Sequence, residues 1–156
     1  DQVIDKTAYN QPSSEVDIFS FVGVLIRTDT IKRAGLPVDN FFYMSDDTEY
    51  ALRLLKMGIK TCLVPSSRIW HHGSATYPSP YAPYSSVKQY YYFRNQLLVY
   101  KKYSTSRSQF AVRFVTVALR AYAKLVKHKE LSVDSFIITT AALYDAFRGR
   151  AFVKNF

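Results

Sequence analysis

Hydrophobic and polar positions divide the chain into a mixed first part and a helical second part. Residues 18–26 are apolar, β-branched and aromatic, which predicts a buried strand interrupted at Gly23. Similar stretches at 59–64 and 68–71 predict two further strands. After residue 85 the apolar positions recur at helical spacing. This pattern predicts helices near 86–103, 107–128 and 133–148.

Capping residues predict two shorter helices in the first part. One begins at Thr28-Asp29-Thr30 and ends at Gly35-Leu36-Pro37. The other covers 47–57 and closes at Gly58. Its start resembles a capping box of Asp46 and Glu49, and Glu49 is spaced to pair with Arg53. The polar residues 1–17 and the proline-rich residues 73–85 are predicted loops. We therefore expect an α/β fold, a small β-α-β portion followed by a basic helical tail.

Composition narrows the class of protein. With 156 residues, 48% of them hydrophobic, the chain has the make-up of one globular domain. The single cysteine, Cys62, cannot form an intrachain disulfide, so a reducing compartment is expected, with Cys62 an inert buried strand residue. No run of eighteen apolar residues occurs, which predicts no membrane span. The chain begins at Asp1 rather than Met, and we expect it to be a piece of a longer protein.

The net charge of +9 is unevenly placed. Residues 1–49 carry nine acidic and four basic residues, whereas residues 50–129 carry fourteen Lys or Arg and no acidic residue. Such a basic block implies an anionic neighbour: nucleic acid, lipid headgroups, a nucleotide phosphate or an acidic domain. No recognition helix, RNP-type motif or zinc spacing accompanies it, which argues against nucleic acid. Bases on one face of the predicted helix 107–128 suit either an anionic membrane, a solvated bundle face or a dimer contact.

Candidate chemistry is concentrated in Asp46-Asp47-x-Glu49 and in His71. The three carboxylates lie at the start of a predicted helix, and the imidazole follows 24 residues after Asp47 at the end of a predicted strand. Together they could hold a divalent metal, or position a carboxylate as general base for a hydroxyl. Carboxylates at a helix start also cap it and interact favourably with its dipole. Both interpretations stay open on these residues alone.

Several motifs over residues 18–103 together resemble glycosyltransferase family 2, and more narrowly bacterial rhamnosyltransferases and galactofuranosyltransferases. No one of them is specific alone. They are Phe21-x-Gly23-x-x-x-Arg27, Gly35-Leu36-Pro37, Phe41-Phe42, Asp46-Asp47-x-Glu49-Tyr50-x-x-Arg53, Gly58, Pro65, Ile69-Trp70-His71 and Tyr90-Tyr91-Tyr92-Phe93-Arg94-Asn95-Gln96.

The resemblance implies a GT-A fold and an inverting enzyme that uses a sugar nucleotide, of the dTDP-rhamnose or UDP-galactofuranose type, with Mg or Mn. By this resemblance Asp47 is the catalytic base, Asp46 and Glu49 bind the acceptor, and His71 is a ligand of the metal. Gly23 and Arg94 are further candidate substrate-binding residues. The acceptor would be a cell-surface polysaccharide or a lipid-linked glycan, reached in the cytoplasm at the inner face of the membrane.

The family's nucleotide-binding half, with its Asp-x-Asp motif, is absent from this sequence. We therefore expect residues 1–104 to be the acceptor and catalytic-base half of a GT-A domain and 105–156 to be a helical extension that matches no motif. The chain alone is predicted to be inactive and to need the other half. A homodimer is a further expected partner, because such a truncated domain would expose aromatic surface. The alternative is a non-catalytic basic module that binds membranes or nucleic acid.

Two features of the sequence, a tyrosine-rich stretch and Arg94, each have two alternative interpretations. Residues 77–103 contain eight tyrosines, which suit either a sugar-stacking platform or packing of helix 86–103 against the absent half. The guanidinium of Arg94 could donate hydrogen bonds to a substrate carboxylate or phosphate, or pair with an acidic residue among the first 49.

Overall fold

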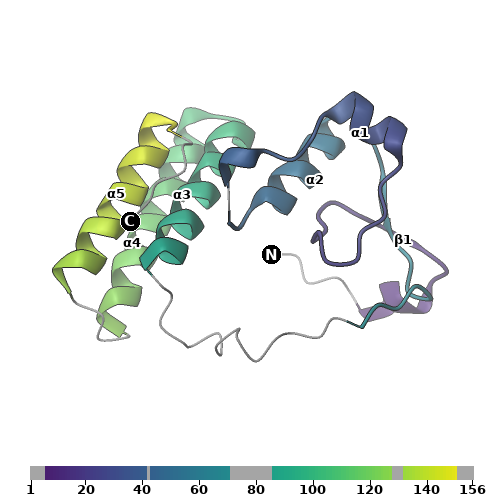
Figure 1. Cartoon of the computed structure of the whole chain (residues 1–156), viewed down its shortest axis with the longest axis horizontal. Helices are drawn as coiled ribbons and strands as arrows, with labels where there is room; N and C mark the ends of the chain where they lie inside the picture. The colour runs from purple at the N-terminus through teal and green to yellow at the C-terminus, as the bar shows by residue number, and fades with distance from the viewer. Residues whose placement is uncertain (1–5, 42, 71–85, 128–131, 151–156) are drawn as a thin grey trace. The chain divides into compact units, whose positions relative to one another are not determined.

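The computed structural model describes residues 6–41, 43–70, 86–127 and 132–150, and most of them are helical (Figure 1). These residues fall into two compact units. Unit 1 contains the described residues of 6–37 and 47–70, and unit 2 contains those of 38–46 and 86–150. In chain order the elements are η1 (Lys6–Asn10), β1 (Ser14–Val16), α1 (Thr28–Ala34), η2 (Asp39–Phe41), α2 (Asp46–Lys56), β2 (Thr61–Leu63), α3 (Ser86–Tyr103), α4 (Arg107–Lys127) and α5 (Val133–Arg148).

The fold is mixed α/β and dominated by helices, so the expected class is confirmed in its coarse form. Within the described ranges the sheet is one antiparallel pair, β1 with β2, in which Glu15 lies opposite Cys62. This pair is too small to test the GT-A assignment, which stays a prediction. None of the described helices is long and apolar enough to cross a bilayer.

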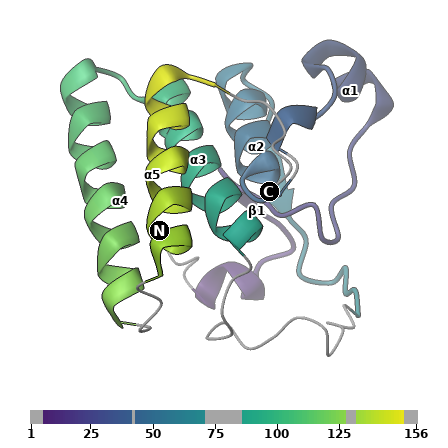
Figure 2. The ribbon, with the colours of Figure 1, turned by 60° about the vertical axis from the view of Figure 1, so that its left-hand side comes forward.

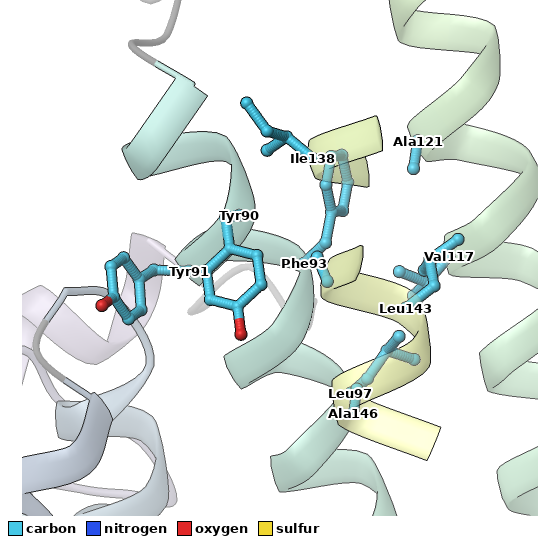
Figure 3. Packing of buried hydrophobic residues seen from close by; sticks show 10 residues of the cluster. Tyr90, Tyr91, Phe93, Leu97, Val117, Ala121, Ile138, Leu143 and Ala146 are labelled. Atoms are coloured by element: carbon cyan, nitrogen blue, oxygen red, sulfur yellow. The ribbon is translucent and has the colours of Figure 1, made fainter. Parts of the chain in front are cut away.

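Unit 2 is built from the three long helices, and all three were predicted within one residue of their ends. α3 packs against both α4 and α5, and α5 packs against α4. Figure 3 shows the core between them. It consists of aromatic and aliphatic side chains from the facing sides of the helices: Tyr90, Tyr91, Phe93, Leu97, Val117, Ala121, Ile138, Ala142, Leu143 and Ala146. The domain boundary expected at residue 104 stays a prediction, although α3 packs with the helices that follow it.

Unit 1 contains the two predicted short helices, α1 and α2, which end before Gly35 and Gly58 as expected. α2 buries Tyr50, Ala51 and Leu54. The Tyr50 hydroxyl donates to the Gly35 carbonyl at 3.0 Å, which ties the end of α1 to α2. This contact fixes the orientation of α2 within the unit.

The predicted buried strand over 18–26 is wrong. These residues form no strand, and Ile18, Val22 and Leu25 are more than half exposed. A fully apolar strand is stable where neighbouring strands take its backbone hydrogen bonds and cover both faces, and no described strand does so here. Gly23 also has a φ of +81°, which breaks the extended path.

Of the two other predicted strands, 59–64 contains a strand in the structure and the described part of 68–71 does not. The stretch 59–64 contains β2, but its partner β1 lies in the predicted loop 1–17, and 68–70 form no strand. Cys62 is exposed rather than buried, so that expectation was wrong as well. A ribbon of two short strands leaves side chains such as that of Cys62 uncovered on one face.

Candidate functional site

Asp46 and Asp47 form the first two residues of α2, and both are partly exposed. Asp47 Oδ1 accepts hydrogen bonds from the Thr48 amide at 2.7 Å and from the Thr48 hydroxyl at 3.3 Å. In the described part of the chain, Asp47 Oδ2 has no hydrogen-bond partner. Asp47 therefore combines a fixed orientation with one carboxylate oxygen that remains available to a ligand.

Glu49 has a different environment. Its side chain is fully buried, and both of its carboxylate oxygens contact the guanidinium of Arg53, one through Nε at 3.3 Å and the other through NH2. Arg53 also donates to the carbonyls of Ala34, at 3.0 Å, and Leu36, at 2.9 Å. The predicted Glu49–Arg53 pair is confirmed. The acceptor contact expected of Glu49 is not available in this structure, because the carboxylate is engaged in holding α1 and α2 together.

The backbone leading into α2 has an unusual conformation. Met44 has a φ of +67° and Ser45 a φ of +66°, and neither is a glycine. Left-handed conformations cost free energy for residues with a Cβ, and they persist where the surroundings impose them. Strain of this kind concentrates at functional sites. Here it directly precedes the Asp46–Asp47 pair.

Two consecutive residues of α3 hold this segment from within unit 2. The buried Asn95 amide nitrogen lies 2.8 Å from the carbonyl oxygen of Phe41, 2.7 Å from that of Tyr43 and 2.9 Å from that of Met44. Arg94 NH2 donates to the Asn40 carbonyl at 2.6 Å. Three acceptors share the two protons of Asn95, so the amide clamps the turn. This role was not predicted from the sequence, where the available signal is a polar residue among the buried positions of α3.

Arg94 is itself fully buried. Its guanidinium carbon lies 4.6 Å from the centre of the Tyr91 ring and 5.3 Å from that of Tyr90, and its Nε donates to Asn95 Oδ1 at 2.9 Å. In this structure Arg94 holds the Asn95 side chain and the Asn40 backbone. Its candidate substrate-binding role stays a prediction.

The tyrosines of α3 are mainly structural. Tyr90 and Tyr91 are fully buried in the core of unit 2, so these two side chains cannot form a sugar platform. Packing of helix 86–103 against the absent half stays a prediction. The Tyr90 hydroxyl donates to Asp145 Oδ2 at 2.7 Å. Burial and this carboxylate raise the pKa of Tyr90 above its ordinary value, and nearby Arg94 opposes the shift. Tyr77, Tyr81 and Tyr84 lie outside the described residues.

The remaining candidates are Gly23 and His71. A Cβ added to Gly23 would lie 2.8 Å from Ile69 Cδ1, the end of an exposed and flexible side chain, and the φ of +81° favours glycine. Backbone conformation therefore accounts for this residue, and its substrate contact stays a prediction. His71 lies outside the described residues. Within the described ranges no three His, Cys, Asp or Glu side chains gather as a metal site. Asp46 and Asp47 by themselves do not make one, and the metal stays a prediction.

The described site is thus a pair of carboxylates at the start of α2, led by Asp47. Glu49 pairs with Arg53 within unit 1, and Arg94 binds the Asn40 backbone within unit 2. No family model, curated protein or solved structure matches the chain.

Proposed function

We propose that this chain is the acceptor and catalytic-base half of an inverting glycosyltransferase. It transfers a sugar from a nucleotide donor of the dTDP-rhamnose or UDP-galactofuranose type to a cell-surface polysaccharide or a lipid-linked acceptor. The motif resemblance over residues 18–103 supports the reaction class. The single observation that carries the proposal is Asp47, a carboxylate oriented by Thr48 with Oδ2 available to a ligand.

The chemistry required of Asp47 is one proton transfer. The acceptor hydroxyl gives its proton to Oδ2 as its oxygen attacks the anomeric carbon, and the bond from that carbon to the diphosphate breaks with both electrons leaving on the diphosphate. Attack opposite the leaving group inverts the anomeric configuration. This step uses Asp47 alone among the described residues. Mg or Mn remains an expectation for the full-length enzyme.

Positioning supports the same assignment. A general base must be held within hydrogen-bond reach of the proton it accepts, and small displacements are costly in rate. The hydrogen bonds to Thr48 restrict the Asp47 carboxylate. Asp46, with no described partner, is suited to bind an acceptor hydroxyl without a fixed orientation.

The decisive experiment compares Asp47→Asn with wild type in the full-length protein, against a panel that includes dTDP-rhamnose and UDP-galactofuranose. Asparagine keeps an oxygen for the Thr48 amide, so the helix start is preserved while the base is lost. We expect kcat to fall by about 10²–10⁴-fold. Asp46→Asn is the matched control and should act mainly on the KM of the acceptor.

Circular dichroism and thermal unfolding establish that each variant is folded. Equal turnover by wild type and Asp47→Asn would reduce Asp47 to a helix-capping residue and overturn the proposal. The absence of transfer from every donor by the folded wild-type protein would favour the non-catalytic alternative.

A further inference from the structure

The outward sides of α4 and α5 carry many large apolar side chains. On α4 they recur every three, four or seven residues and so form one stripe, and each is more than half exposed: Val112, Val115, Leu119 and Val126. α5 has a similar exposed stripe, consisting of Val133, Phe136, Ile137, Tyr144 and Phe147. Each helix also buries its opposite side in the core of unit 2. Both helices are therefore apolar on two sides.

α5 contacts half-buried aromatic residues of α4, Tyr122 and Phe114, through residues of its exposed stripe and its last turns. The rings of Tyr122 and Phe136 lie 5.5 Å apart, and the Tyr122 hydroxyl is 3.0 Å from that of Thr140. Nearer the other end of the pair, the rings of Phe114 and Phe147 lie 5.9 Å apart. Figure 2 shows α4 and α5 side by side. We call the combined surface the α4–α5 face. Exposed apolar stripes of this kind mark a site of association with a protein or a membrane.

The charges around this face favour an anionic membrane over a second copy of the chain as its partner. α4 contains no acidic residue, and Arg107 and Arg120 on α4 and Arg148 at the end of α5 are exposed bases of the same two helices. α5 contributes Asp134 as its exposed acid, because Asp145 is buried against Tyr90. A second copy of the chain would bring bases against bases. An anionic bilayer instead offers an apolar interior to the valines and phenylalanines and negative headgroups to the arginines.

The structure also changes which side of α4 is free to bind. From the sequence, a membrane contact was one of three interpretations of the basic face of this helix. In the structure Arg113 lies over the ring of Tyr100, at 4.8 Å, and Lys124 over that of Tyr92, at 5.7 Å, so these two bases face α3. The apolar stripe is what α4 exposes, with Arg120 at its border.

We infer that the α4–α5 face is a membrane-binding surface, which lies in the plane of an anionic bilayer with its apolar side chains below the headgroups. The inference concerns residues 107–148 and does not depend on the proposed transferase activity. It gives a physical role to the part of the chain that matches no known motif.

Co-sedimentation of the full chain with vesicles tests this surface. The probes are vesicles of phosphatidylcholine alone and of an equal mixture of phosphatidylcholine and phosphatidylglycerol. Wild type should bind the anionic vesicles and bind the neutral ones much more weakly. The double variant Val112→Gln/Leu119→Gln should bind at least about tenfold more weakly, because two inserted side chains become polar. Arg120→Gln should weaken binding to anionic vesicles about fivefold.

Matched controls lie on unit 1. Leu25→Gln removes an exposed apolar side chain, and Arg33→Gln removes an exposed arginine, and neither should change binding. All the substituted side chains are exposed, so the variants should fold, which thermal unfolding checks. Lack of vesicle binding by wild type, or binding by the double variant equal to that of wild type, would overturn the inference. So would a dimer in solution that Val112→Gln/Leu119→Gln dissociates, because the face would then join two copies of the chain.

Discussion

The side-chain amide of Asn95, on α3, lies 2.9 Å from the main-chain carbonyl oxygen of Met44, a residue held in the left-handed region immediately before the candidate catalytic helix. The same nitrogen also contacts the carbonyls of Phe41 and Tyr43. One buried side chain thus binds three backbone carbonyls between the end of η2 and the start of α2.

Replacing Asn95 by leucine should strongly destabilise the protein. Leucine has a similar size but no donor, so carbonyls that Asn95 now satisfies lose their partner, at a cost of about 3 kcal/mol in the free energy of unfolding. Gln96→Leu is the control, because Gln96 makes one long contact, 3.4 Å to the Tyr100 hydroxyl, and should cost less than about 1 kcal/mol. Urea unfolding measures both. Similar losses in the two variants would contradict the clamp.

Ser45 offers a test of backbone strain. Glycine adopts a positive φ without the steric penalty of a Cβ, so Ser45→Gly should raise the free energy of unfolding by about 0.5–1 kcal/mol. Ser45→Val should lower it by about 1–2 kcal/mol, because a β-branched residue tolerates this region least. Urea midpoints compare the two variants with wild type. A stabilising valine would show that Ser45 is not strained.

Gly23 and Ile69 permit a double-mutant cycle. Gly23→Ala faces two costs, the φ of +81° and the approach of its Cβ to Ile69 Cδ1, and should destabilise the protein by about 1–3 kcal/mol. Ile69→Val removes Cδ1 and with it the steric part. The double variant should therefore be more stable than the sum of the two single changes predicts. Additive free energies would mean that backbone conformation alone requires glycine.

The acidic residues at the start of α2 should separate into structural and functional ones. Glu49→Gln leaves the guanidinium of Arg53 without its charged partner in a largely buried place, and should cost about 2–4 kcal/mol. Asp47→Asn, at a partly exposed position, should change the free energy of unfolding by less than about 1 kcal/mol. Thermal and urea unfolding of both variants, beside their turnover, test this division. A large stability loss from Asp47→Asn would indicate that its main role is capping.

The Tyr90 hydroxyl should make stability sensitive to alkaline pH. Its pKa is raised in the folded state by burial and by Asp145, from an ordinary value of 10.0. Above pH 10 the unfolded chain loses this proton while the folded chain keeps it, so the contribution to stability is full below pH 10 and declines as the pH rises. Wild type should lose about 1.4 kcal/mol between about pH 9 and pH 11 from this group.

Tyr90→Phe isolates that loss. The variant lacks the titrating hydroxyl, and it should be less stable than wild type at neutral pH, because Asp145 loses the donor at 2.7 Å. Its free energy of unfolding should nevertheless fall less between the two alkaline pH values. The other tyrosines contribute equally to both proteins and cancel. Parallel pH dependences in urea unfolding would exclude Tyr90 as the source.

Local sequence signals predicted the helices well. Glycines, caps and helical periodicity are short-range features, so α1 to α5 were found close to their observed ends. The sheet was harder, because strand pairing depends on distant residues. The polar residues 14–16 pair with 61–63, whereas the strongly apolar 18–26 pair with nothing described. An apolar run indicates that its side chains tend to be buried, but it does not identify the segment that packs against it or pairs with it.

The candidate site shows the same limit. Asp46 and Asp47 were placed correctly at a helix start from spacing alone. The burial of Glu49 and Arg94, and the role of Asn95, depend on contacts between residues more than fifty positions apart or on the packing of a helix face. Residue type could nominate these side chains. It could not distinguish a residue that binds a ligand from one that supports the backbone.

The hydrogen bonds from Arg53 to the end of α1 have a consequence for local unfolding. α1 has seven residues and buries no side chain, so alone it would open readily. Arg53, fixed by Glu49 on α2, donates to the carbonyl of Ala34, the last residue of α1, and to that of Leu36 just beyond it. The two helices should then open as one cooperative unit. Their slowest amide protons should exchange with deuterium at similar rates, and Arg53→Met should make α1 exchange first while α2 keeps more of its protection.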